Sequence, residues 1–253
     1  MLTDPVYLLA SFLVALLLLR TAREKYFTKH LCFFSYLTYI LVVNLLAIYV
    51  YSFRPKGYSD FYWYTQFLGV AVGYCVMWEI YTHVLRDFPG TAKMARCLVS
   101  GFFFVVLGAA LFNAFYGQSS GLAMSVIRFE RNLQAVQAVL LTLLLILVRY
   151  YTIPLGRNLR GLIWGYGIII VAGIMTLTLR SYIGAPFQLW WQYLQPGSGL
   201  VASAIWLRAF WVYAPNPKAD ASIRLEEDYE VLAERTYRAI AKARASLLRG
   251  LLS

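Results

Sequence analysis

Three side chains that can hold charge or exchange protons lie close together in "CVMWEIYTHVLRDF", residues 75–88. Glu79, His83 and Arg86 are spaced i, i+4 and i+7, so on a helix they share one face. The stretch ends a long apolar run, and a carboxylate inside a membrane is costly unless it is paired, protonated or facing water. His83 and Arg86 are its local partners, and Arg208, near the end of the last apolar run, is a further candidate.

This inner polar cluster of Glu79, His83, Arg86 and Arg208 allows three interpretations. It is a protonation-sensitive lock coupled to the first inner loop or to the C-terminal tail, a static ion pair at the membrane edge, or part of a metal site. A catalytic zinc usually takes three protein ligands, and His30 and His83 are the two histidines of the chain. A three-histidine site is therefore excluded, and His30, Glu79 and His83 remain as metal candidates. We favour no metal.

A second polar stripe begins the fifth apolar run, at "RFERNLQAVQ", residues 128–137. Glu130, Gln134 and Gln137 again recur at i, i+4 and i+7, and buried amides need hydrogen-bond partners. The stripe predicts an outward-facing, ligand-binding pocket for polar or anionic groups. The other residues predicted to line this pocket are Arg180, Trp63, Trp190 and Trp191. The alternative is hydrogen bonding between helices beside an interfacial belt of aromatic residues.

Composition indicates which elements position these side chains. The chain has 253 residues, of which 60% are hydrophobic and only 14% are charged. Soluble domains have roughly 25% charged residues, so the excess apolar surface must face lipid. Seven apolar runs approach the length of about 20 residues that crosses a membrane as a helix: 5–20, 31–53, 61–85, 95–116, 129–151, 161–182 and 198–213. We therefore expect an all-α membrane protein with a seven-transmembrane-helix bundle.

The distribution of basic residues predicts the orientation of this bundle. Lys and Arg are concentrated in the segments that lie inside if the N-terminus is outside and the C-terminus is inside. The first run lacks a basic residue ahead of it and a small-residue cleavage site after it, so no cleavable signal peptide is expected. Residues 1–214 would form the transmembrane domain, and 215–253 a cytoplasmic linker and amphipathic helix.

The last span is interrupted by Pro196, Gly197 and Gly199. We prefer an interfacial helix over 187–194 followed by a short span. One long helix over 187–213, kinked at Pro196, is the alternative.

The tail, residues 222–252, has apolar residues at helical spacing, with acids in its first turns and bases in its last turns. An isolated helix of this length needs a partner surface. It can dock on the loops, lie on the inner leaflet, where anionic lipid favours its basic half, or pair with another chain. We expect no output domain after it, and therefore a protein partner through 222–252; a homo-oligomer remains open. Nucleic acid is not expected, since the basic residues flank apolar runs or lie in this mixed-charge tail.

Several cofactors are disfavoured by the residues present. A retinal Schiff base needs a lysine inside the bundle, and every lysine falls in a loop or the tail. Haem held by His30 and His83 is disfavoured because both lie near the membrane edge. Cys32, Cys75 and Cys97 fall one in each of three apolar runs and are expected to be buried, without a disulfide framework.

Two further patterns predict helix packing. The GxxxG stretch from Gly69 to Gly73 indicates close approach of two helices. Asn44 and Asn113, isolated in the second and fourth spans, are expected to form hydrogen bonds between helices.

The stretch "ERNLQAVQAVLLTLLLILVRYYTIPLGRNLRGLIWGYGI", residues 130–168, resembles a set of uncharacterised bacterial seven-helix inner-membrane proteins. In that set an acid–arginine start to the fifth helix precedes an inner loop and a glycine-rich sixth helix. The resemblance implies the fold and the bacterial cytoplasmic membrane, and it implies no activity. The topology is also similar to sensory seven-helix modules of bacterial receptors, which commonly continue into a signalling domain.

We therefore expect a receptor-like or sensory membrane protein that signals through a separate partner. A non-catalytic assembly or anchoring subunit of a larger membrane complex is the alternative. A small-molecule transporter is the third, and polar clusters at opposite faces fit it poorly without a site at the membrane midplane. An enzyme is the least favoured class.

Overall fold

The computed structural model describes residues 5–23, 26–54, 57–116, 122–183, 187–218 and 224–252. Within these ranges every regular element is a helix, which confirms the all-α prediction. The helices are α1 (Pro5–Arg23), the short 3₁₀ helix η1 (Tyr26–Lys29), α2 (Leu31–Phe53), α3 (Tyr58–Val84), α4 (Pro89–Tyr116), α5 (Leu122–Tyr150), α6 (Arg157–Ile183), α7 (Phe187–Phe210) and α8 (Leu225–Leu252).

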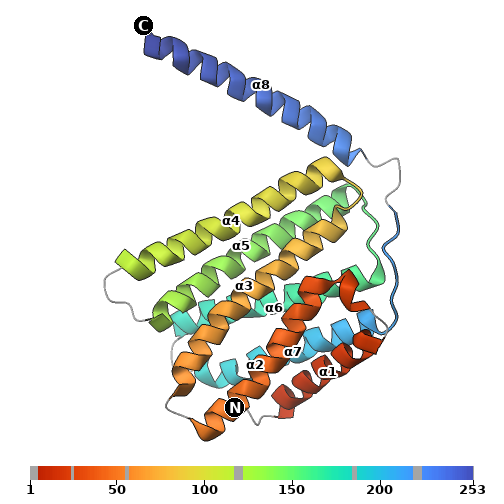
Figure 1. Ribbon diagram of the computed structural model, residues 1–253, viewed down its shortest axis with the longest axis vertical. Helices are drawn as coiled ribbons and strands as arrows, with labels where there is room; N and C mark the ends of the chain where they lie inside the picture. The colour runs from red at the N-terminus through yellow and green to blue at the C-terminus, as the bar shows by residue number, and fades with distance from the viewer. Residues whose placement is uncertain are drawn as a thin grey trace.

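Helices α1 to α7 pack side by side in one bundle, and α8 projects from it (Figure 1). Helix α7 lies against both α6 and α1, α2 lies against α3, and α5 contacts α3, α4 and α6. Helices α2, α4 and α6 begin at the end of the bundle from which α8 leaves, and we call this the α8 end.

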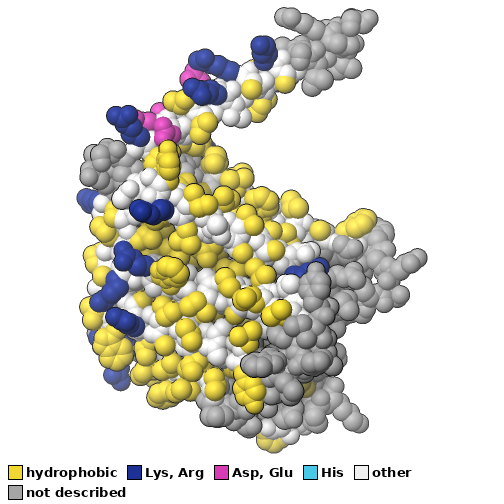
Figure 2. Space-filling view, turned by 180° about the vertical axis from the view of Figure 1, so that it is seen from behind, with side chains coloured by type: hydrophobic (Ala, Val, Ile, Leu, Met, Phe, Trp, Pro, Cys, Tyr) yellow, Lys and Arg dark blue, Asp and Glu magenta, His cyan; other side chains and the backbone are white. Residues whose placement is uncertain are grey.

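Four of these helices contain stretches long and apolar enough to cross a membrane: Leu31–Val50, Pro89–Ala109, Arg131–Tyr150 and Arg157–Thr176. Their outward faces are apolar as well, and Phe104, for example, is 67% exposed. Hydrophobic side chains cover much of the bundle surface (Figure 2). Surface of this kind is typical of a protein that faces lipid.

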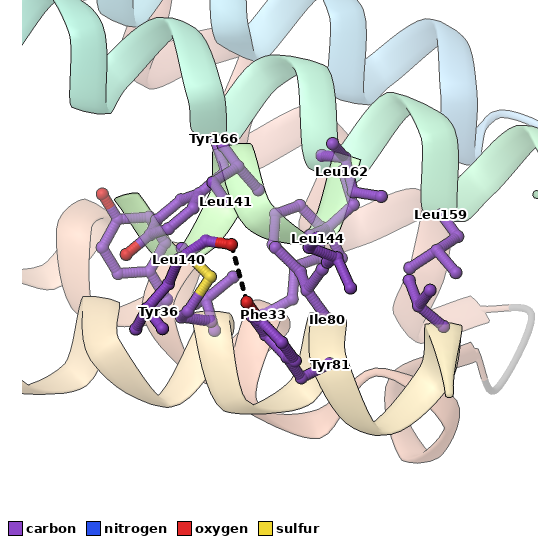
Figure 3. Packing of buried hydrophobic residues seen from close by; sticks show 14 of the residues in the cluster. Phe33, Tyr36, Ile80, Tyr81, Leu140, Leu141, Leu144, Leu159, Leu162 and Tyr166 are labelled. Atoms are coloured by element: carbon purple, nitrogen blue, oxygen red, sulfur yellow. Dashed lines mark hydrogen bonds between the residues drawn. The ribbon is translucent and has the colours of Figure 1, made fainter. Parts of the chain in front are cut away.

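Tyrosine side chains and glycines join the helices in the core. The Tyr81 hydroxyl on α3 donates to the Leu140 carbonyl on α5 over 2.6 Å (Figure 3). Tyr166 on α6 donates in the same way to the Gly73 carbonyl on α3. A Cβ at Gly73 would lie 3.2 Å from the Tyr166 hydroxyl, and one at Gly69 would lie 3.2 Å from the Tyr39 ring. The prediction of close packing at this GxxxG stretch is confirmed.

The predicted hydrogen bond of Asn44 is also present. Its amide on α2 donates to the Ser11 hydroxyl on α1 over 3.1 Å. The side chain of Asn113 lies outside the described residues.

Two expectations about the fold are wrong. Helix α7 runs without interruption from Phe187 to Phe210, through Pro196, so the preferred division into an interfacial helix and a short span does not hold. A proline removes one intrahelical hydrogen bond, and packing against neighbouring helices compensates for that loss.

The three cysteines are free thiols, but Cys75 and Cys97 are exposed on the bundle surface and Cys32 is half-buried. A lipid-facing surface accepts a small apolar side chain as readily as a core does.

Candidate functional site

Glu79, on α3, is the best-connected acid at the α8 end of the bundle. Its side chain is 6% exposed, and its carboxylate accepts hydrogen bonds from the backbone N–H groups of Phe33, over 2.7 Å, and Cys32, over 3.3 Å. These N–H groups belong to the first turn of α2 and have no partner within their own helix. Glu79 therefore caps the N-terminus of α2 from a neighbouring helix, and the helix dipole favours its negative charge.

A sequence signal for this cap exists. The residue before α2 is His30, whose side chain forms no capping hydrogen bond. Because Ser, Thr, Asp or Asn usually fills that position, its absence indicates that the cap comes from elsewhere in the chain. Glu79 is the acid within the adjacent predicted span, 61–85, and it lies toward that end.

His83 lies between two backbone carbonyl groups. Its Nδ1 is 2.9 Å from the Glu79 carbonyl oxygen, and its Nε2 is 3.0 Å from the carbonyl oxygen of Lys29 in η1. A carbonyl oxygen only accepts hydrogen bonds, so both contacts are satisfied together only when both ring nitrogens carry protons. The geometry therefore fits the imidazolium form, which links η1 to α3. A neutral His83 would keep only one of the two bonds.

His30 stacks on His83, with ring centroids 4.6 Å apart and an interplanar angle of 27°. Its side chain is 5% exposed, and the edge of its ring meets Phe210 of α7 at 5.4 Å. Its Nδ1 is buried and has no hydrogen-bond partner among the residues that the structure describes. Burial, together with the charges of His83 and Lys29, lowers the pKa of His30 to about 4. His30 is therefore neutral at pH 7, and it stacks on the ring of His83, whose two carbonyl contacts fit the imidazolium form.

The potential ligand atoms of His30, Glu79 and His83 lie within 4.8 Å of one another. Two imidazoles share a metal ion only when the ion lies near both ring planes. Nearly parallel stacked rings do not aim at a common point, and both nitrogens of His83 already face carbonyl oxygens. The stacked arrangement does not fit a shared metal ion.

The structure does not bring the two predicted arginines to Glu79. Arg86 is exposed and lines a small pocket with His83 and Asp87, whereas Arg208 is exposed in a separate hollow beside Arg157. Among the residues that the structure describes, neither arginine forms an ion pair with Glu79. For Arg208 the reason is helical phase, because it lies two residues, about 200° around α7, from the Phe210 that faces His30.

The outer polar stripe is described only in part. Gln137 is buried, and its amide donates to the Tyr166 hydroxyl on α6 over 3.1 Å. Gln134 packs against Gly173 of α6, where an added Cβ would lie 2.6 Å from the glutamine oxygen. The hydrogen bond of Gln137 agrees with the alternative interpretation, in which the stripe forms hydrogen bonds between helices and does not line a ligand pocket. The remaining members of the predicted outer pocket have side chains outside the described residues: Glu130, Arg180, Trp63, Trp190 and Trp191.

The base of α8 is fixed to the bundle by two acids. The Glu226 carboxylate accepts hydrogen bonds from the backbone N–H of Gly90, over 2.5 Å, and of Thr91, over 3.3 Å. These groups begin α4, so Glu226 caps α4 as Glu79 caps α2. Asp228 accepts a hydrogen bond of 2.8 Å from the Tyr151 hydroxyl, just after α5.

Sequence reasoning missed the aromatic cluster that joins α7 to this site. The Phe33 ring lies 5.1 Å from both Trp206 and Phe210. With 17% aromatic residues in the chain, no single aromatic position gave a signal.

Comparisons with protein-family models, with curated proteins and with solved structures found no match to this chain.

Proposed function

We propose that the protein is a receptor-like membrane protein of seven transmembrane helices that passes its conformational state to a separate protein through α8. The observation that carries this proposal is the attachment of α8 at one end only. Glu226 and Asp228 hold its base, while the described side chains from Glu230 to Ala243 are exposed. They include large apolar residues: Val231, Leu232, Tyr237 and Ile240.

The seven spans are supported by the three helices beyond the four candidates. Helices α1, α3 and α7 have 19, 27 and 24 residues and pack in the same bundle. At about 1.5 Å per residue, the length of even α1 is close to the thickness of a hydrocarbon core, about 30 Å. Lys and Arg side chains gather at the α8 end in the face shown in Figure 2. This favours the α8 end as the cytoplasmic end, in a bacterial inner membrane as the resemblance implies.

The site at the α8 end would act as the lock between two states of the bundle. His83 forms both of its hydrogen bonds, to the Lys29 carbonyl of η1 and to the Glu79 carbonyl of α3, only when it is protonated. The neighbouring His30 contacts Phe210 near the end of α7. Beyond α7 the chain continues to Tyr213, whose ring lies 3.7 Å from the Lys29 ammonium group. A change at His83 would therefore be passed along residues 211–218 to α8.

The test measures the position of α8 directly. Spin labels are placed on the exposed Cys97 of α4 and on an Ile240→Cys variant, in a chain whose other two cysteines are alanine. We expect two distance populations whose ratio changes between about pH 5 and 8, where histidine switches. His83→Gln, which cannot take up a proton at this position, should abolish that change, and Glu230→Gln, at an exposed position of α8, should preserve it.

The groups that could contribute to this pH response lie around His83. They are His30, Lys29 and Glu79 at the site, and Arg86, Asp87 and Lys218 in the adjoining pocket. A His83→Gln variant whose two distance populations change with pH as in the wild type would show that the lock interpretation is wrong.

The assembly-subunit alternative uses the same exposed helix as a static dock. It predicts a single distance at every pH, and co-purification with a defined protein in fixed stoichiometry that is lost when residues 230–252 are removed. That combined result would replace the receptor proposal.

A further inference from the structure

Helices α1, α2, α6 and α7 line a partly open cavity of about 240 Å³ that lies away from both predicted polar clusters. It is lined by Tyr36 and Asn44 of α2 and by Gly199 and Ser203 of α7. Asn44 and Gly199 lie near the middle of α2 (Leu31–Phe53) and α7 (Phe187–Phe210), whereas Tyr36 and Ser203 lie closer to the α8 end. The cavity therefore extends from the middle of the bundle toward the α8 end, and secondary transporters place their small-molecule sites near the membrane midplane.

The sequence of α7 explains why space remains there. Pro196 and Gly199 both line the cavity, and a Cβ added at Gly199 would meet no atom within 4 Å. Small residues in membrane helices usually allow close approach. Here none of the described side chains of the neighbouring helices occupies the space that the glycine leaves.

The lining defines the charge of the occupant. The described residues that line the cavity have several hydroxyl groups and one amide. None of these described residues is Asp, Glu, Lys or Arg. The Asn44 amide donates to the Ser11 hydroxyl over 3.1 Å, and Ser203 is 4% exposed. A charged molecule would lose its hydration here without gaining an opposite charge.

We propose that this cavity is a binding site for a small uncharged molecule with an apolar body and one or two hydrogen-bonding groups. Its volume of about 240 Å³ equals that of roughly eight water molecules at about 30 Å³ each. This is the scale of an aromatic alcohol or amide. Trp206 and Tyr36 supply aromatic surface for the body, and Ser11, Asn44 and Ser203 supply hydrogen bonds.

The cavity adjoins the site at the α8 end through one aromatic contact. Trp206 lines the cavity, and its ring lies 5.1 Å from that of Phe33, whose backbone N–H is bound by Glu79. A ligand that moves Trp206 would therefore act on the α2 cap. The role of the ligand as the input to α8 rests on the proposed function, whereas the binding site itself does not.

The first experiment tests entry into the cavity. A Ser203→Cys variant, in a chain whose three native cysteines are alanine, is treated with neutral methyl methanethiosulfonate and with its sulfonatoethyl and trimethylammonium-ethyl analogues. We expect the neutral reagent to label the introduced thiol at least about tenfold faster than either charged one, since each 1.4 kcal/mol of burial cost gives about tenfold. Ser11→Cys gives a second thiol in the same cavity if the first variant does not fold.

Filling the cavity supplies the matched control. Gly199→Leu should slow labelling about tenfold, by the same free-energy scale. Gly197→Leu, two residues away and also in open space, lines a separate apolar groove between α5, α6 and α7 and should leave the rate nearly unchanged. Equal labelling by neutral and charged reagents, or no labelling by the neutral one at either position, would overturn the proposal.

The second experiment tests binding with three probes of one shape. Benzyl alcohol should protect the introduced thiol from the neutral reagent, whereas benzoate and benzylammonium should not. Protection by a charged probe, or none by the alcohol, would contradict a site for uncharged molecules. These outcomes are independent of the spin-label distances, so failure of the α8 proposal and failure of this site are distinguishable.

Discussion

The two halves of α7 use small residues in opposite ways. In the half near the α8 end, Ala209 and Trp206 press against Gly161 and Gly165 of α6, where an added Cβ would overlap their side chains. In the middle of the helix, Gly199 faces open space. Helix α7 is therefore packed tightly where it meets the polar site and loosely where it borders the cavity.

Because of this difference, one half of α7 is suited to holding side chains in place and the other half is suited to binding a small molecule. Close-packed interfaces have few alternative arrangements, because added or lost volume is felt at once. The tight half of α7 can therefore hold Phe210 against His30, while the loose half can admit another molecule. Substitutions should be costly in the first region and tolerated in the second.

Loss of the Glu79 carboxylate should have the largest effect. Glu79→Leu leaves the N–H groups of Cys32 and Phe33 without their acceptor, and each buried unpaired group costs about 1–3 kcal/mol. We expect the variant to lose about 4 kcal/mol of stability, measured by circular dichroism during unfolding in mixed detergent micelles. Glu79→Gln, which keeps one acceptor oxygen, should lose less. Glu230→Leu, at an exposed position of α8, is the control, and equal stability of both leucine variants would refute the cap.

Acid should weaken the same region through His30. Its pKa is lowered to about 4, mainly by burial and then by the charges of His83 and Lys29. Between pH 6.5 and about 4 the unfolded chain binds a proton that folded His30 does not, so stability falls as the pH falls through this window. The full loss is about 3 kcal/mol at 1.36 kcal/mol per pKa unit.

His30→Phe isolates that contribution, because a phenyl ring keeps the aromatic contact with Phe210 but cannot take up a proton. The difference in stability between pH 7 and pH 4 should be smaller in this variant than in the wild type. The two proteins share every other titratable side chain, so the comparison isolates His30. An unchanged pH dependence would mean that folding does not lower the pKa of His30.

The sequence predicted the polar site and the close packing of α3 better than it predicted the cavity. Spacing brought Glu79 and His83 to one helix face, and the small residues of the Gly69–Gly73 stretch indicated close packing. The partners of Glu79 were missed because backbone N–H groups have no residue-type signature of their own, and the only signal was indirect, a helix start at His30 without a usual capping residue. The cavity was missed for a related reason. Whether Gly199 allows contact or leaves space depends on the neighbouring helices, which the sequence of α7 does not encode.

Overfilling the tight half of α7 should cost less than removing the cap. Gly165→Ala places a methyl group against the Trp206 indole, which is 1% exposed and is also held by α2 through Phe33. Overpacking of this kind costs about 1–3 kcal/mol, so we expect a loss of about 2 kcal/mol in the same unfolding assay. Gly101→Ala on the surface of α4 has open space around it and serves as the control. A Gly165→Ala variant as stable as this control would show that α6 and α7 are not closely packed.

The smallest expected effect has the opposite sign. Gly199→Ala adds a methyl group where no atom lies within 4 Å, so it creates no overlap. Alanine is favoured over glycine in a helix by about 0.5–1 kcal/mol, and we expect a gain in stability of about that size. Gly101→Ala, also open but on the surface of α4, should gain a similar amount. If Gly199→Ala instead loses stability, α7 is packed tightly at its middle as well, and its two halves do not differ.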